Sequence, residues 1–192
     1  MEVREAISRR RSIRRFTDQP VPREMIEKVL SAAVLAPSAK NRQPWRLVVL
    51  QGAARVKLAR LMEEGAASVE ARGESCGSCR SSARIVAQAP VTILVFNPEY
   101  HHKGVIFDHA SYNAPDIQSI GGMVQTMLLA AEDAGLGTLW ICDILFAYSL
   151  IRDWLGRDEE MVTAVSIGYA EGYPEARPRT RWQEITEWRE AE

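Results

Sequence analysis

The feature that most constrains the fold of this chain is the uncharged run 91–96, Val-Thr-Ile-Leu-Val-Phe, which is rich in β-branched side chains. A strand of this kind is apolar on both faces, so each face needs a covering layer. Further apolar runs at 47–50, 138–142 and 162–169 predict three more strands. Apolar residues at helical spacing predict helices over 2–9, 22–34, 53–64, 117–134 and 147–155. The pattern predicts a sheet between helical layers, in an α/β or α+β fold, and the few, widely separated strands disfavour a doubly wound sheet.

The helix predicted over 117–134 has the clearest boundaries. Asp116 is a residue type that caps helix N-termini, and Gly135 is a residue type that ends helices. Gly121 and Gly122 lie inside this helix, and each lowers its intrinsic stability by about 1 kcal/mol relative to alanine. Close packing or the approach of a ligand would explain them. Residues 65–82 show no clear pattern.

Charge is balanced over the whole chain but not along it. The 192 residues have a net charge of −1, which gives no general attraction to nucleic acid or to an anionic membrane. The first 15 residues nevertheless carry six arginines and two glutamates, which favours a local anion site. The length suits one domain. Three cysteines form no disulfide framework, and the charged N-terminus lacks the apolar region of a signal peptide, so we expect a cytoplasmic location.

The common nucleotide-binding and hydrolase motifs are missing from the sequence. No G-x-G-x-x-G follows a predicted strand, no Gly-rich loop ends in Gly-Lys-Ser or Gly-Lys-Thr, and no G-x-S-x-G forms an elbow between a predicted strand and a predicted helix. The three histidines lack the H-x-x-x-H spacing of a helical zinc site. These absences disfavour a Rossmann dehydrogenase, a P-loop NTPase and an α/β-hydrolase.

The clearest candidate for an anion site is the segment that contains Arg10, Arg11, Ser12 and Arg14. It supplies three guanidinium groups, which bind phosphate oxygens with paired hydrogen bonds, and one hydroxyl. Taken alone, the segment fits a solvated basic turn or a set of surface ion pairs equally well.

Two further polar segments support a binding site. Ser38, Asn41 and Gln43 lie in one loop before a predicted strand, and such side chains can match the donors and acceptors of a heterocycle. A capped helix end followed by a turn is the alternative interpretation of this loop. Arg179 and Arg181 follow the last predicted strand and fit either a phosphate clamp or a charged, mobile tail.

Taken in order along the chain, these segments resemble the FMN-dependent nitroreductase family. Each segment is short, but the ordered set covers nearly the whole chain. The matching segments are Arg-Arg-Ser-Ile-Arg-Arg-Phe at 10–16, Pro-Ser-Ala-Lys-Asn-Arg-Gln-Pro-Trp at 37–45, the helix 116–134 with Gly-Leu-Gly-Thr-Leu-Trp at 135–140, Ser-Ile-Gly-Tyr at 166–169, and Pro-Arg-Thr-Arg at 178–181.

The resemblance implies an α+β fold, a three-layer α-β-α sandwich whose sheet is mixed and mainly antiparallel. Residues 1–192 would form one FMN-binding domain within an intertwined homodimer, with two FMN sites at the interface. Residues 172–192 would form a C-terminal arm that packs on the partner subunit. Trp182 and Trp188 fit this expectation, because two tryptophans in a polar tail need a surface that covers them.

The resemblance also implies roles for individual residues. One group matches the family's contacts with the FMN phosphate and ribityl chain: Arg10, Arg11, Ser12 and Arg14, together with Arg179 and Arg181, which would close on the phosphate. A second group matches contacts with the ring or ribityl region, in Asn41 and Gln43, and with the flavin of the partner subunit, in Pro37 and Ser38. A third group falls where the family's backbone lines one ring face near N5: Trp140, Ile141 and Cys142.

The activity implied by the resemblance is an NAD(P)H-dependent FMN oxidoreductase that reduces nitroaromatics, quinones or similar small acceptors. NADH or NADPH stacks transiently on the flavin, passes hydride to N5 and leaves, and the acceptor then takes its place. This ping-pong use of one pocket requires no Rossmann motif. The flavin carries the chemistry, so no side chain acts as a nucleophile and no metal is expected.

Two features depart from the family pattern and leave alternatives open. Some family members have an acidic residue where Cys142 falls, so the acceptor cannot be transferred by analogy. Cys76 and Cys79 form a C-x-x-C pair that suits a redox pair, half of a metal site completed by the histidines, or two loop residues, and the last is the leading interpretation. The alternative functions are a flavoenzyme with a specific reductive task, such as dehalogenation or enone reduction, and a non-catalytic redox or metal sensor.

Overall fold

The apolar run 91–96 forms β2 (Val91–Asn97), and all of its residues are buried. In the computed structural model, which describes residues 1–98 and 114–190, β2 pairs with β1 (Arg46–Gln51) and β4 (Glu160–Gly168), and β4 pairs with β3 (Gly137–Ile141). All three pairings are antiparallel. The predicted central strand is therefore confirmed, and each of the four predicted strands is present.

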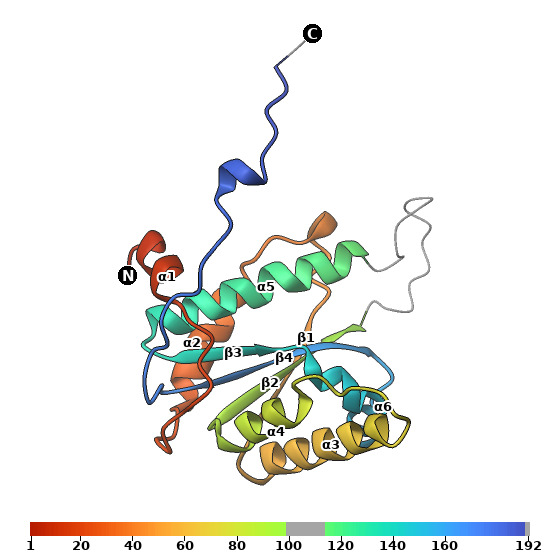
Figure 1. Cartoon of the computed structure of the whole chain (residues 1–192). Coiled ribbons are helices and arrows are strands. Elements are labelled where there is room, and N and C mark those ends of the chain that lie inside the picture. Colours follow the sequence, from red (N-terminus) through yellow and green to blue (C-terminus); the bar gives the residue numbers. More distant parts are fainter. Residues whose placement is uncertain (99–113, 191–192) are drawn as a thin grey trace.

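The two faces of β2 contribute to two separate cores. Val91, Ile93 and Val95 pack under α2 (Arg23–Ala33) and α5 (Ala114–Asp133), whereas Leu94 and Phe96 pack against the opposite layer. That layer contains α3 (Gly52–Glu70), α4 (Cys79–Gln88) and α6 (Tyr148–Leu155) (Figure 1). Burial of each such side chain contributes about 1.5–3 kcal/mol. The predicted three-layer sandwich and its mainly antiparallel sheet are confirmed.

Helix α5 differs from its prediction at the first turn and agrees at the end. Asp116 lies inside the helix rather than at its N-cap, and its buried carboxylate forms an ion pair with Arg42 at 2.9 Å. Gly135 has a φ of +75°, the left-handed conformation expected after a helix. A Cβ built at Gly121 or Gly122 meets no atom within 4 Å in the described chain, so packing within this chain does not require these glycines.

The segment that showed no clear pattern is largely helical. Helix α3 continues through Gly65, where the chain needs a glycine because a Cβ would lie 2.5 Å from the carbonyl oxygen of Phe146. Helix α4 begins at Cys79 and buries one face, which contains Cys79, Ser82, Ala83, Ile85 and Val86. Cys79 is therefore a core residue at a helix start, which corrects its interpretation as a loop residue.

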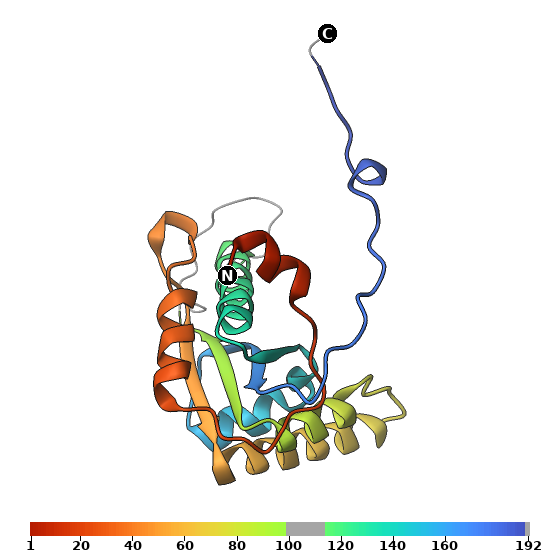
Figure 2. The same ribbon diagram turned by 90° about the vertical axis from the view of Figure 1, so that its left-hand side faces the viewer.

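Three features at the ends of the fold prepare the site. Helix α1 (Val3–Arg9) packs on α5, and the chain then runs along the free edge of β3. Residues 171–190 are all exposed, and this tail leaves the body of the molecule (Figures 1 and 2). Trp182 is 57% exposed and Trp188 is 75% exposed. Over residues 1–98 and 114–190, no helix has the length and apolar character needed to cross a membrane.

Candidate functional site

The arginines that follow α1 line a cavity between two segments far apart in the sequence. Residues 10–14 form one side and residues 174–179 of the tail form the other, around a volume of about 410 Å³. We call this cavity the arginine hollow. Its lining residues are Ile7, Ser8, Arg10, Arg11, Ser12, Arg14, Pro174, Glu175, Ala176, Arg177 and Arg179. Five arginines against one glutamate give the hollow a strongly positive lining.

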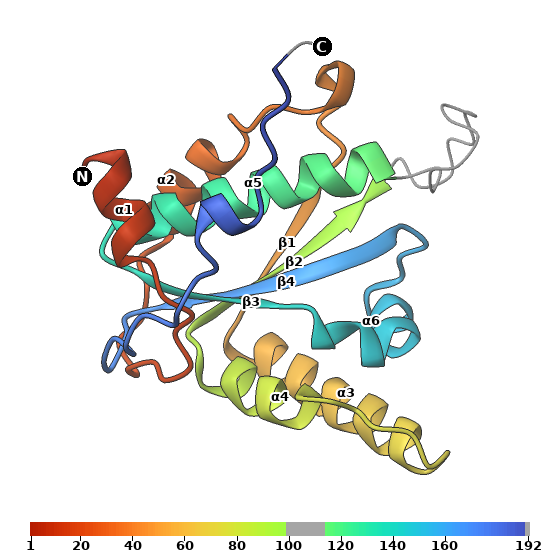
Figure 3. The ribbon, with the colours of Figure 1, turned by 45° about the horizontal axis from the view of Figure 1, so that its top comes forward.

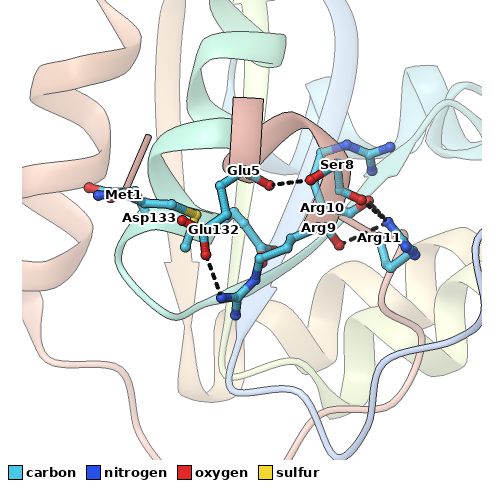
Figure 4. Close-up of polar contacts among 8 residues, drawn as sticks. All are labelled: Met1, Glu5, Ser8, Arg9, Arg10, Arg11, Glu132 and Asp133. Atoms are coloured by element: carbon cyan, nitrogen blue, oxygen red, sulfur yellow. Dashed lines mark hydrogen bonds and ion pairs between the residues drawn. The ribbon is translucent and has the colours of Figure 1, made fainter. Parts of the chain in front are cut away.

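Three of the arginines in this lining are not neutralised by carboxylates of the described residues. Arg10, Arg11 and Arg14 form no ion pair within residues 1–98 and 114–190, whereas the preceding residue, Arg9, lies 3.4 Å from the buried carboxylate of Glu132 (Figure 4). Guanidinium groups without a carboxylate partner are available to bind a phosphate with charge-assisted hydrogen bonds. The structure therefore brings the predicted arginines of residues 10–14 together in one positively charged lining.

Arg11 also shapes the end of α1. Its Nη1 donates hydrogen bonds to the carbonyl oxygens of Ser8 at 2.7 Å, Arg9 at 3.0 Å and Arg10 at 3.0 Å (Figure 4). A cation at this position satisfies the unpaired carbonyls of the last helical turn and interacts favourably with the helix dipole. Arg11 thus fixes the turn that leads into the arginine hollow as well as lining it.

A smaller cavity, of about 180 Å³, adjoins the arginine hollow and shares Arg10 and Ser12 with it. We call it the Trp140 hollow. Its other lining residues are Gln125 and Leu128 of α5 and Thr138 and Trp140 of β3. The two hollows together offer cationic groups at one end and an aromatic side chain at the other.

Hydrogen bonds hold the end of β3 in place. Trp140 is 39% exposed, yet its Nε1 donates to the hydroxyl of Thr163 at 2.8 Å. That hydroxyl donates in turn to the carbonyl oxygen of Ile141 at 2.9 Å. The side chain of Ile141 is buried in the core, so only its backbone can face a ligand. Cys142, the residue directly after the strand, is exposed.

Backbone contacts also fix the arginine segment against β3. Ser12 and Thr138 form a parallel bridge, and the N–H of Ile13 donates to the carbonyl oxygen of Thr138 at 2.8 Å. A Cβ at Gly137 would lie 2.7 Å from Cγ1 of Ile13, so glycine permits this close approach. The arginine hollow and the Trp140 hollow therefore have a fixed position relative to each other.

The polar loop between α2 and β1 has an unusual backbone. Lys40, Asn41 and Gln43 have positive φ values of 54°, 55° and 51°. Non-glycine residues in this conformation are frequent at functional sites, where the surroundings support the strain. The hydroxyl of Ser38 accepts a hydrogen bond from the N–H of Gln43 at 3.0 Å and so closes the loop on itself. Pro37 is exposed at its start.

This loop is attached to the opposite end of α5 from α1. The N–H of Ala39 donates to the hydroxyl of Ser119 at 3.1 Å, and Arg42 pairs with Asp116. Asp116 lies about 24 Å along the helix from Glu132, the residue that pairs with α1, given a rise of about 1.5 Å per residue. Figure 3 shows the loop and α1 near opposite ends of α5. The four predicted site residues in this loop line neither hollow, so a single chain does not bring them to the arginines.

The two predicted tail arginines are placed differently. Arg179 lines the arginine hollow, and its Nη1 donates to the carbonyl oxygens of Arg177 at 3.3 Å and Pro178 at 3.2 Å. Arg181 lies in the exposed tail, just before the short helix Trp182–Glu184, and lines neither hollow.

Sequence reasoning missed several residues that line the two hollows. On α5, intervals of three residues separate Gly122, Gln125 and Leu128, so helical spacing could have placed these residues next to one another on the same side of the helix. Thr138 lies within the matching segment 135–140 but was assigned no role, and Glu175 lies in no such segment; the docking of the arginine segment and of the tail brings them to the site.

The C-x-x-C pair lies at the start of α4, in the layer of α3, α4 and α6, and is buried. The hydrogen bond to Glu70 is the largest cause that raises the pKa of Cys76, and burial raises the pKa of Cys79 to about 11. Over the described residues, no three His, Cys, Asp or Glu side chains form a group that could hold a metal ion. His101, His102 and His109 lie outside the described residues, so the suggested four-ligand site is not among those that the structure describes.

Comparison with known proteins identifies the family of this chain. A family model for the nitroreductase family matches residues 7–169. A Methanothermobacter thermautotrophicus protein named NADH dehydrogenase/NAD(P)H nitroreductase is 31% identical over 185 residues, which cover 94% of this chain and 82% of that protein. A 4-nitrobenzoate reductase from Pseudomonas putida is 28% identical over 194 residues, with coverage of 86% and 84%.

The solved structures agree with these sequence matches. A nitroreductase from Desulfovibrio desulfuricans, crystallised in complex with FMN, aligns with a TM-score of 0.76 at 27% identity and covers 98% of both chains. The family resemblance and the fold predicted from the sequence are thereby confirmed.

Proposed function

The chain belongs to the nitroreductase family, and from this premise we propose that it is an NAD(P)H-dependent FMN oxidoreductase that reduces nitroaromatic, quinone or similar acceptors. The observation that carries the proposal is the arginine hollow, whose cations have no carboxylate partner among residues 1–98 and 114–190, and which continues into the Trp140 hollow. The names of the relatives, among them a 4-nitrobenzoate reductase and an NAD(P)H nitroreductase, support the same activity.

The residues present suit both ends of FMN. A phosphate dianion needs several strong donors, and Arg10, Arg14 and Ser12 supply guanidinium groups and a hydroxyl in one lining. The flat ring of FMN needs an apolar surface beside it, and Trp140 and Leu128 supply such a surface in the adjoining hollow. We therefore assign the phosphate to the arginine hollow, closed by Arg179, and the ring to the Trp140 end.

When bound, FMN supplies reversible hydride exchange with a nicotinamide donor and then with an acceptor. The chain's own residues have other tasks. Guanidinium groups orient the cofactor from its phosphate end, and the bridge between Ser12 and Thr138 keeps that end in register with the wall formed by Trp140. If the ring lies as the family resemblance implies, backbone N–H groups at the end of β3, around Cys142, would donate to its polar atoms. No side chain needs to act as a nucleophile.

The site is completed by a second copy of the chain. Pro37, Ser38, Asn41 and Gln43 lie on a strained loop about 24 Å along α5 from the end that holds α1. A loop that cannot reach the arginines of its own chain can reach those of a partner, so we assign it to the partner's flavin. The exposed tail, with the tryptophans described above, would pack on the same partner and bring Arg181 to the phosphate.

The sensor alternative receives no support from the described residues. Both thiols of the C-x-x-C pair are buried and their pKa values are raised, and reactive cysteines need the opposite combination. Whether the acceptor is a nitroaromatic, a quinone, a halogenated compound or an enone is decided by experiment. The cytoplasmic location stays a prediction from the sequence.

Anaerobic stopped-flow spectroscopy tests this proposal. Purified protein is mixed with NADH or NADPH, and the loss of the visible absorbance band of oxidised flavin is followed. The reduced protein is then mixed with each acceptor of a panel that includes nitrobenzoates, quinones, haloaromatics and enones. We expect reduction by at least one nicotinamide and fast reoxidation by nitroaromatics or quinones. Protein that binds flavin but is not reduced by either nicotinamide would contradict the proposal.

A further inference from the structure

The short helix that follows β3, Asp143–Ala147, is fastened to α4 through one carboxylate. We propose that Asp143 is a positioning residue, held by Ser78 and Ser82, which fixes the end of β3 against the flavin ring. This inference rests on the proposed function, because it concerns the ring end of the same site. It also gives the Cys-Gly-Ser-Cys segment, which the flavin site does not use, a physical role.

The fastening consists of two hydrogen bonds to one oxygen atom. Oδ2 of Asp143 accepts from the hydroxyl of Ser78 at 2.5 Å and from the hydroxyl of Ser82 at 2.8 Å. Hydrogen bonds to an ionised carboxylate are shorter and stronger than those between neutral groups. Ser82 is only 6% exposed, so its hydroxyl has little access to water if Asp143 moves away. These contacts favour a single position of Asp143, the residue directly after Cys142.

The donors themselves sit on a rigid support. Cys79 is fully buried, and its thiol donates to a carbonyl oxygen of α3 at 3.4 Å. Cys76 donates to a carboxylate oxygen of Glu70 at 3.0 Å, and Arg80 holds that same carboxylate at 2.6 Å. The two thiols thus anchor the segment at both of its ends and present the hydroxyl of Ser78 between them. In this arrangement the cysteines are anchors and not a redox pair.

The other side of the short helix is clamped as well. The carbonyl oxygen of Phe146 lies so close to α3 that only glycine fits at position 65. The ring of Phe146 lies 3.9 Å from where a Cβ of Gly77 would be, so the Cys-Gly-Ser-Cys segment lies beside this ring. The short helix is therefore held between α3 and α4.

The consequence for the site follows from the order of residues along the chain. Trp140 lines the hollow assigned to the ring, and its strand end is tied on one side to Thr163 of β4. Asp143 ties the same strand end on the other side to α4. Loss of the Asp143 contacts leaves the backbone at Cys142 free to shift, whereas the arginine hollow, at the far end of the cofactor, keeps its shape. Cofactor binding and hydride transfer should therefore respond differently to this change.

The experiment compares the variant Ser78→Ala/Ser82→Ala with wild type and with Ser81→Ala, a matched control on the exposed side of α4. Three quantities are measured on each protein: FMN content, the visible spectrum of the bound flavin, and the limiting rate and apparent Kd for anaerobic flavin reduction by NAD(P)H. We expect unchanged FMN content and apparent Kd, a shifted flavin band, and a limiting rate reduced about tenfold or more, because a misplacement of about 1 Å can cost on the order of 100-fold. The control should match wild type.

A second variant covers the case in which the double variant does not fold. Asp143→Asn keeps the shape and one oxygen acceptor but removes the charge, so the limiting rate should fall while FMN is retained. Folded variants with the spectrum and limiting rate of wild type would overturn the proposal, as would a rate that falls only in proportion to lost FMN. If wild-type protein binds no flavin, the proposed function fails as well. If wild type binds and reduces flavin while the variants are unaffected, only the inference about Asp143 fails.

Discussion

Replacement of Arg10 and Arg14 by alanine separates cofactor binding from folding. A hydrogen bond to a charged group contributes about 1.5–3 kcal/mol when partly buried. We assign that range to the half-buried Arg10 and only the lower value to the exposed Arg14, which gives a loss of about 3–4.5 kcal/mol. At about 1.4 kcal/mol per tenfold, the Kd for FMN rises roughly 10²–10³-fold.

The fold should tolerate this double change. Neither arginine forms an ion pair within residues 1–98 and 114–190, and the described hydrogen bond of Arg14 goes to a carbonyl of its own loop. Surface substitutions of this kind change the free energy of unfolding by about 0.5 kcal/mol or less. Urea unfolding of the FMN-free protein should therefore give the wild-type midpoint.

The assay is fluorescence titration of the FMN-free protein with FMN. The matched control is Arg60→Ala/Arg84→Ala, which removes the same charge from exposed positions on the opposite helical layer. The control should keep the wild-type Kd. A double variant of Arg10 and Arg14 that binds FMN as tightly as wild type would refute the assignment of the phosphate, and equal losses in both variants would show that only net charge matters.

Three further predictions concern the tail, a carboxylate and the thiols. Removal of the chain from Trp182 onward should weaken the dimer at least about tenfold in analytical ultracentrifugation, because Trp182 and Trp188 are exposed in the single chain and tryptophans at an interface are frequent hot spots. A wild-type protein that sediments as a monomer with FMN bound contradicts this. The hydrogen bond from Arg80 is the main cause that lowers the pKa of Glu70 to about 2. The ionised Glu70 therefore stabilises the folded protein at pH values above its ordinary pKa of 4.5, and this stabilisation is lost as the pH falls toward 2. Glu70→Gln should flatten the acid limb of a plot of urea midpoint against pH, and an unchanged limb would count against the ion pair. In native protein, DTNB should react rapidly with Cys142 alone, because burial raises the pKa of Cys79 to about 11; several fast thiols would contradict the buried placement of the C-x-x-C pair.

The parts of the fold that could be predicted are those in which one local signal dominates. The run 91–96 has no charge on either face, and it forms a strand of residues 91–97 buried on both sides. Gly135 ends a long apolar helix with a positive φ, as its type predicts. The arginines of 10–14 lie next to one another in sequence, so a single turn brings them into one lining.

The parts that could not be predicted depend on contacts between distant segments. Gly65 resembles a helix stop, but α3 continues through it because the carbonyl of Phe146 occupies the space of a side chain. The buried residues of α4 do recur at helical spacing, but Cys79 and Ser82 among them are small or polar, so a search for large apolar residues does not register this helix. Asp116 resembles a helix cap, yet it pairs with Arg42, 74 residues away.

The candidate site divides in the same way. Its phosphate end is local in sequence and could be recognised, whereas Gln125, Leu128 and Thr138 become neighbours only when α5 and β3 meet. The loop with Asn41 and Gln43 was recognised by its pattern, but its distance from the arginines within one chain is visible only in the structure.

The most direct test of the central claim is the identity and amount of flavin released from the purified chain. Protein denatured after gel filtration is analysed by chromatography and absorbance against FMN, riboflavin and FAD standards, and the chain concentration is measured in parallel. We predict a yellow protein that releases FMN, close to one molecule per chain after saturation with FMN. A colourless protein that takes up no FMN, or one that carries a metal ion in its place, would contradict the account.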